Sequence, residues 1–135
     1  MSLIQNKEGV VKTKYVAIVL HKIVGESSSV WEDIAFERWQ KILEYASTSM
    51  NFAKRLPIEV TFDDGNNSDY EIAFPGLLEN DLKAKFFIIT DNVGKSGYLN
   101  WNQIIEMHKY GMKFGSHSKS HVDLTAISHN EALIE

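Results

Sequence analysis

The sequence Glu59-Val60-Thr61-Phe62-Asp63-Asp64-Gly65 places two adjacent carboxylates and a glycine directly after an apolar run. The β-branched and aromatic residues between Ile58 and Phe62 predict a buried strand, and Gly65 is a turn signal that ends it. Two acids at the tip of such a strand repel each other and lose solvation. We therefore expect a cationic group to lie beside Asp63 and Asp64.

A second polar cluster, Ser116-His117-Ser118-Lys119-Ser120-His121, follows another short strand-like run. One aspartate and two histidines form a suitable ligand set for a borderline divalent metal such as zinc. Each motif alone has an ordinary explanation, since Asp-Asp-Gly is a common turn and H-x-x-x-H arises by chance. The two together, both at strand ends, indicate a metal site, although electrostatics does not decide which aspartate binds the ion.

These two motifs resemble those of the polysaccharide deacetylases, the NodB-homology domain. The run 61–65 is similar to the first family motif and the run 115–121 to the second, H-[ST]-x-x-H, with Asp123-Leu124-Thr125 following as it usually does. The resemblance is closest to the subgroup that includes poly-N-acetylglucosamine deacetylases. In that subgroup the first strand ends in a Tyr-His or similar pair, which here is Leu20-His21.

The resemblance implies a metal-dependent hydrolase that removes N-acetyl or O-acetyl groups from an acetylated glycan. One divalent ion, zinc with cobalt or nickel as alternatives, would be held by Asp64, His117 and His121. Asp63 would be the general base, and Ser118 would orient the histidine segment by a local hydrogen bond. His21 is an accessory candidate, with a hydrogen-bonded histidine at a strand end as its alternative interpretation.

Strand and helix patterns alternate along the chain, which predicts an α/β fold of parallel strands in right-handed βαβ units. We expect strands at residues 15–20, 58–63, 83–90 and 112–116. Helices are predicted at residues 35–45 (extending towards 50), 70–78, 100–110 and from 128 onward. The last two should open with capping boxes, Asn100 with Gln103 and Ser128 with Glu131. Pro75 should kink the second helix, and residues 66–69 should form a polar turn with a helix cap. The family resemblance makes this the first half of a distorted (β/α) barrel, with active groups at the carboxyl ends of the strands.

For the domain organisation, we expect residues 1–14 to be an N-terminal extension and residues 15–135 a partial NodB-homology domain. The family's later motifs supply an arginine, an aromatic wall, an oxyanion donor and a histidine acid, and they do not occur in these 135 residues. The chain alone should therefore be weak or inactive. The alternative is a truncated, non-catalytic domain that binds metal or glycan. An open barrel edge favours a homodimer or a domain swap.

Composition excludes several classes of protein. The 135 residues are 44% hydrophobic and 24% charged, which argues against disorder. A net charge of −4 gives no basic footprint for nucleic acid, and the absence of cysteine excludes disulfides and thiolate ligands. No apolar run is long enough for a membrane span, and the polar start lacks a signal peptide. Resemblance to the family implies an extracytoplasmic location, in the cell envelope or outside it.

Overall fold

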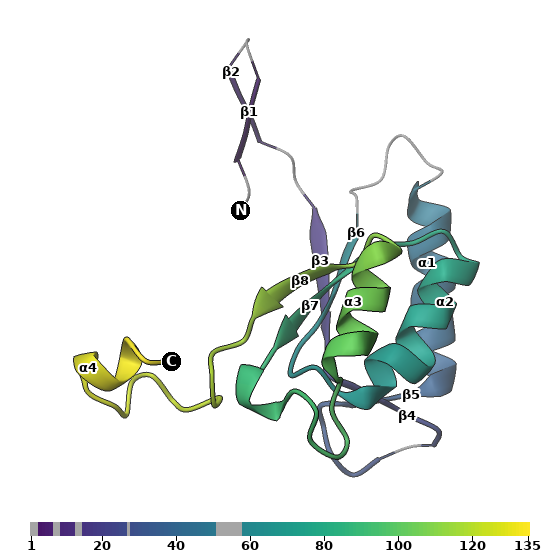
Figure 1. Ribbon diagram of the computed structural model, residues 1–135. Coiled ribbons are helices and arrows are strands. Elements are labelled where there is room, and N and C mark those ends of the chain that lie inside the picture. Colours follow the sequence, from purple (N-terminus) through teal and green to yellow (C-terminus); the bar gives the residue numbers. More distant parts are fainter. Residues whose placement is uncertain (1–2, 7–8, 13–14, 27, 51–57) are drawn as a thin grey trace.

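The computed structural model describes residues 3–6, 9–12, 15–26, 28–50 and 58–135. Its centre is a parallel sheet in the order β3-β6-β7-β8. The strands are β3 (Val16–Leu20), β6 (Ile58–Phe62), β7 (Ala84–Ile88) and β8 (Lys113–Ser116). One face of the sheet is covered by α1 (Phe36–Met50), α2 (Phe74–Glu79) and α3 (Trp101–Lys109), as Figure 1 shows. The predicted α/β fold with parallel strands is confirmed.

A row of aromatic rings crosses the sheet and sets its register. Phe62 pairs with Phe86, and Phe86 with Phe114, so the three rings lie side by side on neighbouring strands. Their ring centroids are 5.0 Å and 5.5 Å apart. Trp39 of α1 meets Phe62 edge-on at 5.4 Å and is fully buried. Because aromatic rings bury large areas and prefer such geometries, this row joins the helix layer to the central strand.

The strands β4 (Lys22–Val24) and β5 (Asp33–Ala35) form a separate parallel pair that the sequence analysis did not predict. Each strand has three residues, which is too short for an alternating pattern to be recognised. Both insert an isoleucine into the core, since Ile23 is 2% exposed and Ile34 is 8% exposed. The described residues between the two strands, 25–26 and 28–32, are exposed to solvent.

The second helical region begins as a π-helix, η1 (Asp69–Ala73), and continues as α2. The expected kink at Pro75 is therefore replaced by a change of helix type upstream of it. Pro75 lies in the first turn of α2, where its missing amide is not needed for an intrahelical hydrogen bond. The helix cap expected within residues 66–69 is not formed by Ser68, the residue before η1, because its hydroxyl accepts from the Ile23 amide at 3.1 Å and makes no cap hydrogen bond.

Both predicted capping boxes are present. Asn100 and Gln103 exchange hydrogen bonds of 2.8 and 3.1 Å at the start of α3. Ser128 and Glu131 do the same at the start of α4 (His129–Ala132). Strand β7 ends earlier than predicted, because a 3₁₀ turn, η2 (Thr90–Asn92), follows it closely.

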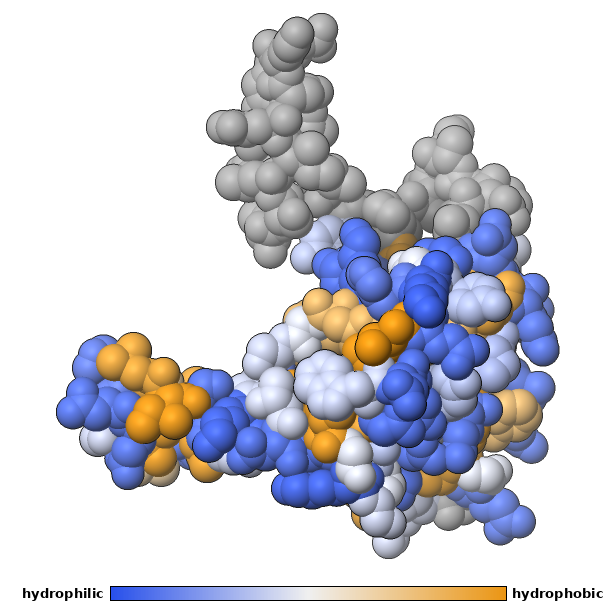
Figure 2. All heavy atoms as spheres, viewed as in Figure 1, coloured by the Kyte–Doolittle hydropathy of each residue, from blue (hydrophilic) through white to orange (hydrophobic). Residues whose placement is uncertain are grey.

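Two segments stand apart from the sheet and helix layers (Figure 1). Near the N-terminus, β1 (Leu3–Asn6) and β2 (Gly9–Lys12) form an antiparallel pair that was not predicted. At the other end, the segment carrying α4 projects away, and Figure 2 shows hydrophobic side chains on its surface. These exposed side chains are Val122, Leu124, Leu133 and Ile134. Among the described residues, no helix is both long and apolar enough to cross a bilayer.

Candidate metal centre

The two aspartates lie where the sequence predicted, at the carboxyl end of β6. This strand has a neighbour on both sides, β3 and β7, and its last three residues are buried. The amide of Asp63 donates to the carbonyl of Leu20 at the end of β3, with an N–O distance of 2.8 Å. The carboxylates therefore emerge from the best-supported strand of the sheet.

A tight turn then redirects the chain. Asp64 and Gly65 both have left-handed backbones, with φ of 75° and 77°. A Cβ at Gly65 would lie 2.9 Å from Cδ1 of Ile88, so only glycine fits between the turn and β7. The carbonyl of Gly65 accepts from the Leu99 amide at 2.9 Å, which ties the turn to the loop before α3. The Asp64 side chain is thereby held in one direction, and it is 21% exposed.

The histidines leave β8 in a loop alongside the end of β7. The amide of His117 donates to the Ile88 carbonyl at 2.8 Å, in continuation of the strand pairing. Ser118 and His121 have φ of 61° and 62°, and the Ser118 hydroxyl accepts from the His121 amide at 2.9 Å. This is the kind of local hydrogen bond expected of Ser118. The result is a compact turn that brings the two imidazole rings to a centroid distance of 4.9 Å.

The turn at Asp64 and the loop that carries the two histidines bring their side chains together at one point. Oδ1 of Asp64 lies 3.7 Å from Nε2 of His117 and 3.8 Å from Nε2 of His121. One donor atom from each of the three residues falls within 4.8 Å of the others. Oδ1 of Asp64 is buried and has no hydrogen-bond partner among the described residues. A buried acceptor without a donor is costly, and these three groups therefore have the spacing and chemistry of an incomplete ligand set.

The other two sequence candidates near the site lie outside this group. Asp63 is half-buried and is not one of the three converging residues. His21 follows β3 at the same edge of the sheet, is half-buried, and has its ring 6.4 Å from that of Trp31.

Asp69 is a buried carboxyl group that the sequence analysis placed in a polar turn. It is fully buried, and neither carboxyl oxygen has a hydrogen-bond partner among the described residues. Burial raises the pKa of Asp69 well above its usual value, and the nearby Asp64 carboxylate raises it further. The Asn66 amide lowers this pKa in part, and Asp63 raises it slightly. Helical spacing to the buried Ala73 and Leu77 was the available sequence signal, since residues four apart share a face.

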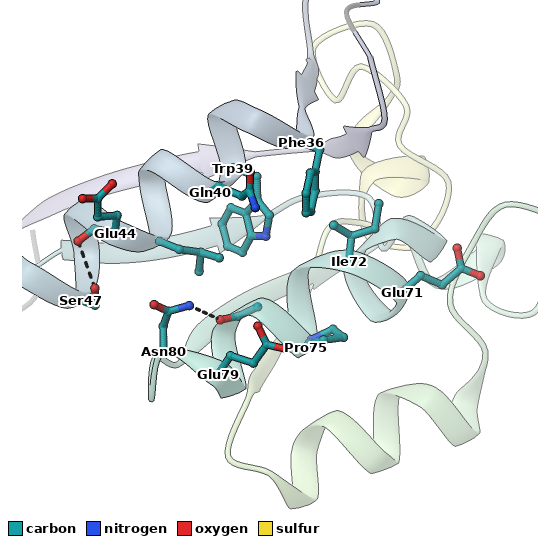
Figure 3. Close-up of a pocket in the computed structure, with 12 residues that line it drawn as sticks. Phe36, Trp39, Gln40, Glu44, Ser47, Glu71, Ile72, Pro75, Glu79 and Asn80 are labelled. Atoms are coloured by element: carbon teal, nitrogen blue, oxygen red, sulfur yellow. Dashed lines mark hydrogen bonds between the residues drawn. The ribbon is translucent and has the colours of Figure 1, made fainter.

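A groove lies elsewhere, on the helix layer. It has a volume of about 480 Å³ and is lined by residues of α1, η1 and α2, with none of the candidate site residues among them. Figure 3 shows Phe36, Trp39 and Gln40 of α1 facing Ile72, Pro75 and Glu79. The convergence of the three ligating groups, and not this groove, therefore marks the candidate site.

Comparison with known proteins identifies the family of the chain. Residues 53–135 match the family described as polysaccharide deacetylase. YxkH of Bacillus subtilis, whose name assigns it to the polysaccharide deacetylases, is 33% identical over 69 residues. That alignment covers 51% of this chain and 25% of YxkH.

Solved structures share the fold. The Streptococcus pyogenes deacetylase PplD, determined with acetate, superposes with a TM-score of 0.79 at 24% identity, covering 90% of this chain and 63% of PplD. IcaB from Ammonifex degensii superposes with a TM-score of 0.66 at 25% identity, covering 90% of this chain and 64% of IcaB. The chain thus spans a quarter of YxkH and less than two thirds of PplD or IcaB. The match over residues 53–135 confirms the resemblance in the motifs, and the chain belongs to the polysaccharide deacetylase family.

Proposed function

We propose that this chain carries the metal site of a deacetylase that removes acetyl groups from an acetylated glycan. Asp64, His117 and His121 are the proposed ligands of one divalent ion, with zinc as the best match and cobalt or nickel as alternatives. The observation that carries the proposal is the convergence of one carboxylate oxygen and two imidazole nitrogens within 4.8 Å.

The donor spacing fits zinc. Zinc bonds to histidine nitrogen and carboxylate oxygen are about 2.1 Å long, so a tetrahedral ion holds its ligand atoms roughly 3.4 Å apart. The distances of 3.7 and 3.8 Å from Asp64 to the two imidazoles are close to that value. Three protein ligands leave a coordination position open, which is the arrangement of catalytic zinc sites. A bound ion would also satisfy the unpaired Oδ1 of Asp64.

The positions of the two aspartates support different roles for them, with Asp64 as a metal ligand and Asp63 as the general base. Asp64 approaches both imidazoles, whereas Asp63 lies outside the converging group. A divalent ion supplies a water of lowered pKa and polarises the acyl oxygen. We assign Asp63 as the base that accepts the proton of the attacking water, a role that typically contributes about 100- to 10,000-fold. Ser118 is assigned as a positioning residue, because its hydroxyl fixes the His121 amide.

The substrate and setting are proposed at the level of chemical class. Family membership and the acetate in the PplD structure support an acetylated polysaccharide or amino-sugar oligomer as the substrate. An extracytoplasmic location follows from the same relationship. We propose residues 15–135 as the family domain and residues 1–14 as an extension. The exposed apolar side chains around α4 support a homodimer or swapped assembly.

Turnover by these 135 residues alone is proposed to be slow. His117 and His121 are assigned to the metal, which leaves His21 as the remaining imidazole at this edge of the sheet among the described residues. Its ring contacts Trp31, and no hydrogen bond orients it towards the carboxylates in that part of the chain. Acetate release from N-acetylglucosamine oligomers with zinc present should therefore be weak. Robust turnover that a chelator abolishes would show that His21 or another group acts as the acid.

Zinc calorimetry tests the ligand assignment without requiring turnover. His117→Ala should weaken zinc binding by more than about 100-fold, whereas the matched variant His108→Ala should bind like wild type, because His108 is exposed on α3. Imidazole binds metal only when neutral, so the affinity should fall below about pH 6. Equal affinity in His117→Ala and wild type would contradict the ligand set. Asp63→Asn should retain zinc, and loss of zinc there would mean that the two aspartate roles are exchanged.

A further inference from the structure

Trp31 is the most exposed large hydrophobic side chain of the described residues, at 86%. Within the described part of the chain, its ring contact is with His21, at a centroid distance of 6.4 Å and an interplanar angle of 59°. Indole rings dominate recognition surfaces because they bring large, rigid contact area at a small entropic cost. An indole left in solvent beside a candidate site therefore suggests a ligand.

The segment that presents Trp31 is anchored at both ends by buried strand residues. It connects β4 and β5, whose central residues Ile23 and Ile34 are buried in the core. The Asp33 amide donates to the Val30 carbonyl at 3.2 Å and closes a turn around the tryptophan. The Ile23 amide also donates to Ser68, which lies in the same connection as Asp63 and Asp64. The backbone that carries Trp31 is thus connected to the frame that holds the carboxylates.

The strand register relates the position of the Trp31 ring to that of the proposed base, Asp63. Leu20 pairs with Phe62, so the following residues, His21 and Asp63, lie side by side at the ends of neighbouring strands. Neighbouring strands are about 4.8 Å apart, and the Trp31 ring lies one ring contact beyond His21. The indole therefore lies at the same edge of the sheet as Asp63, in contact with the side chain that follows the neighbouring strand.

We propose that Trp31, backed by His21, is a stacking platform for a second sugar ring of the glycan, next to the one that is deacetylated. This inference rests on the proposed function and narrows its substrate to oligomers or polymers. A pyranose ring has an apolar face of C–H groups, which packs on the face of an indole while its hydroxyls remain in water.

Two other occupants fit less well. An anionic membrane surface would be repelled by the neighbouring Glu26 and Glu32 and by the net charge of −4, whereas an acetylated amino-sugar polymer is uncharged. A contact with a second copy of the chain would not explain why the indole lies beside His21, at the edge of the sheet that carries Asp63 and Asp64. Continuity with the metal centre favours the glycan.

The experiment uses the zinc-loaded chain with N-acetylglucosamine and its linear tetramer as probes. Binding is followed by calorimetry and by the three indole N–H signals in NMR, from Trp31, Trp39 and Trp101. The tetramer should shift the Trp31 signal and bind more tightly than the monomer. Trp31→Ala should weaken tetramer binding by about tenfold, and Trp31→Phe should recover part of the loss. Trp101→Ala, which removes an indole that is 60% exposed at the start of α3, should bind the tetramer like wild type.

Equal tetramer affinity in Trp31→Ala and wild type, no preference for the tetramer, or an equal loss in Trp101→Ala would each overturn the platform. A Trp31→Ala protein that changes from dimer to monomer, measured by sedimentation, would assign the ring to a second copy. Zinc affinity is measured on the same samples and should not differ between Trp31→Ala and wild type. Failure of zinc binding in every sample would reject the metal site, while the tetramer comparison would still decide the platform.

Discussion

The two halves of the proposed metal centre are supported very differently. The carboxylate turn, residues 63–69, is fastened on several sides: to β3 through Leu20, to β7 by the contact of Gly65 with Ile88, and to the loop before α3 through Leu99. The histidine loop, residues 117–121, is held mainly along the end of β7, by backbone hydrogen bonds to residues 88–91. The side chains also differ in exposure: that of Asp64, in the carboxylate turn, is 21% exposed, and that of His121, in the histidine loop, is 58% exposed.

This difference implies that folding alone positions the carboxylate, whereas metal binding is needed to position the second histidine. The carboxylate turn is formed by the same packing that stabilises the sheet, so it should persist without metal. The imidazole of His121 lies on an exposed residue, whose amide is held by the Ser118 hydroxyl at the end of a loop that is bonded to residues 88–91 and to Glu135. We infer that the fold presents the anionic ligand in advance, and that metal fixes the position of His121.

The largest expected effect lies in the core behind the carboxylate turn. Trp39→Ala removes a fully buried indole that packs edge-on against Phe62, and it should lower the free energy of unfolding by about 3–5 kcal/mol. Trp31→Ala, at the most exposed tryptophan, should change it by less than about 0.5 kcal/mol. Urea denaturation measures both. Similar losses in the two variants would mean that the aromatic row does not support the core.

The turn itself gives a smaller effect. Gly65→Ala places a methyl group 2.9 Å from Ile88 on a backbone with φ of 77°, so about 1–3 kcal/mol of stability should be lost, with weaker zinc binding. Gly25→Ala is the control, because nothing lies within 4 Å of its added Cβ. Chemical denaturation and zinc calorimetry on both variants test the effect. A Gly65→Ala protein with wild-type zinc affinity would show that the turn does not position Asp64.

Substitutions in the histidine loop should cost little folding stability but should clearly lower the affinity for zinc. Ser118→Ala removes the acceptor of the His121 amide, a hydrogen bond whose net contribution of about 0.5–1.5 kcal/mol corresponds to roughly 2- to 12-fold in zinc affinity. Ser120→Ala removes a hydroxyl that pairs with Glu135 instead and should leave the affinity unchanged. Equal affinities in the two variants would indicate that metal alone organises the loop.

The last prediction concerns the sign of a pH dependence. Because burial and Asp64 raise the pKa of Asp69, the folded protein keeps a proton that the unfolded chain releases above about pH 4. Stability of the metal-free protein should therefore fall as pH rises from about 4 through the raised pKa of Asp69. Asp69→Asn should flatten this fall and be the more stable protein at neutral pH. Thermal unfolding in a chelator measures it, and a parallel profile for both proteins would assign the slope to other groups.

Sequence reasoning was accurate where a pattern repeats or a motif has local chemistry. The strands around Phe62, Phe86 and Phe114 and the capping boxes at Asn100 and Ser128 are confirmed, because burial and capping leave regular traces in the sequence. The proposed ligands were named from their motifs, and the structure brings Asp64, His117 and His121 together.

The remaining features depend on long-range contacts. The pair β4–β5 has no detectable periodicity, and only packing of Ile23 and Ile34 identifies it. Residues 66–69 were expected to cap a helix, but the Ser68 hydroxyl accepts a hydrogen bond from the amide of Ile23, 45 residues away in the sequence. Asp69 was expected in the same polar turn, yet it begins a π-helix and is buried in the interior. None of these choices can be made from local propensity, because tertiary contacts override it.

The central claim is that one ion is held by Asp64 and by Nε2 of two particular histidines. It is tested most directly by NMR of the imidazole nitrogens of all five histidines during a zinc titration. We expect the Nε2 signals of His117 and His121 to shift together and to saturate at one equivalent, with those of His21, His108 and His129 unchanged. Zinc-dependent shifts at His21, or an unchanged His121 signal at saturation, would contradict the proposed metal centre.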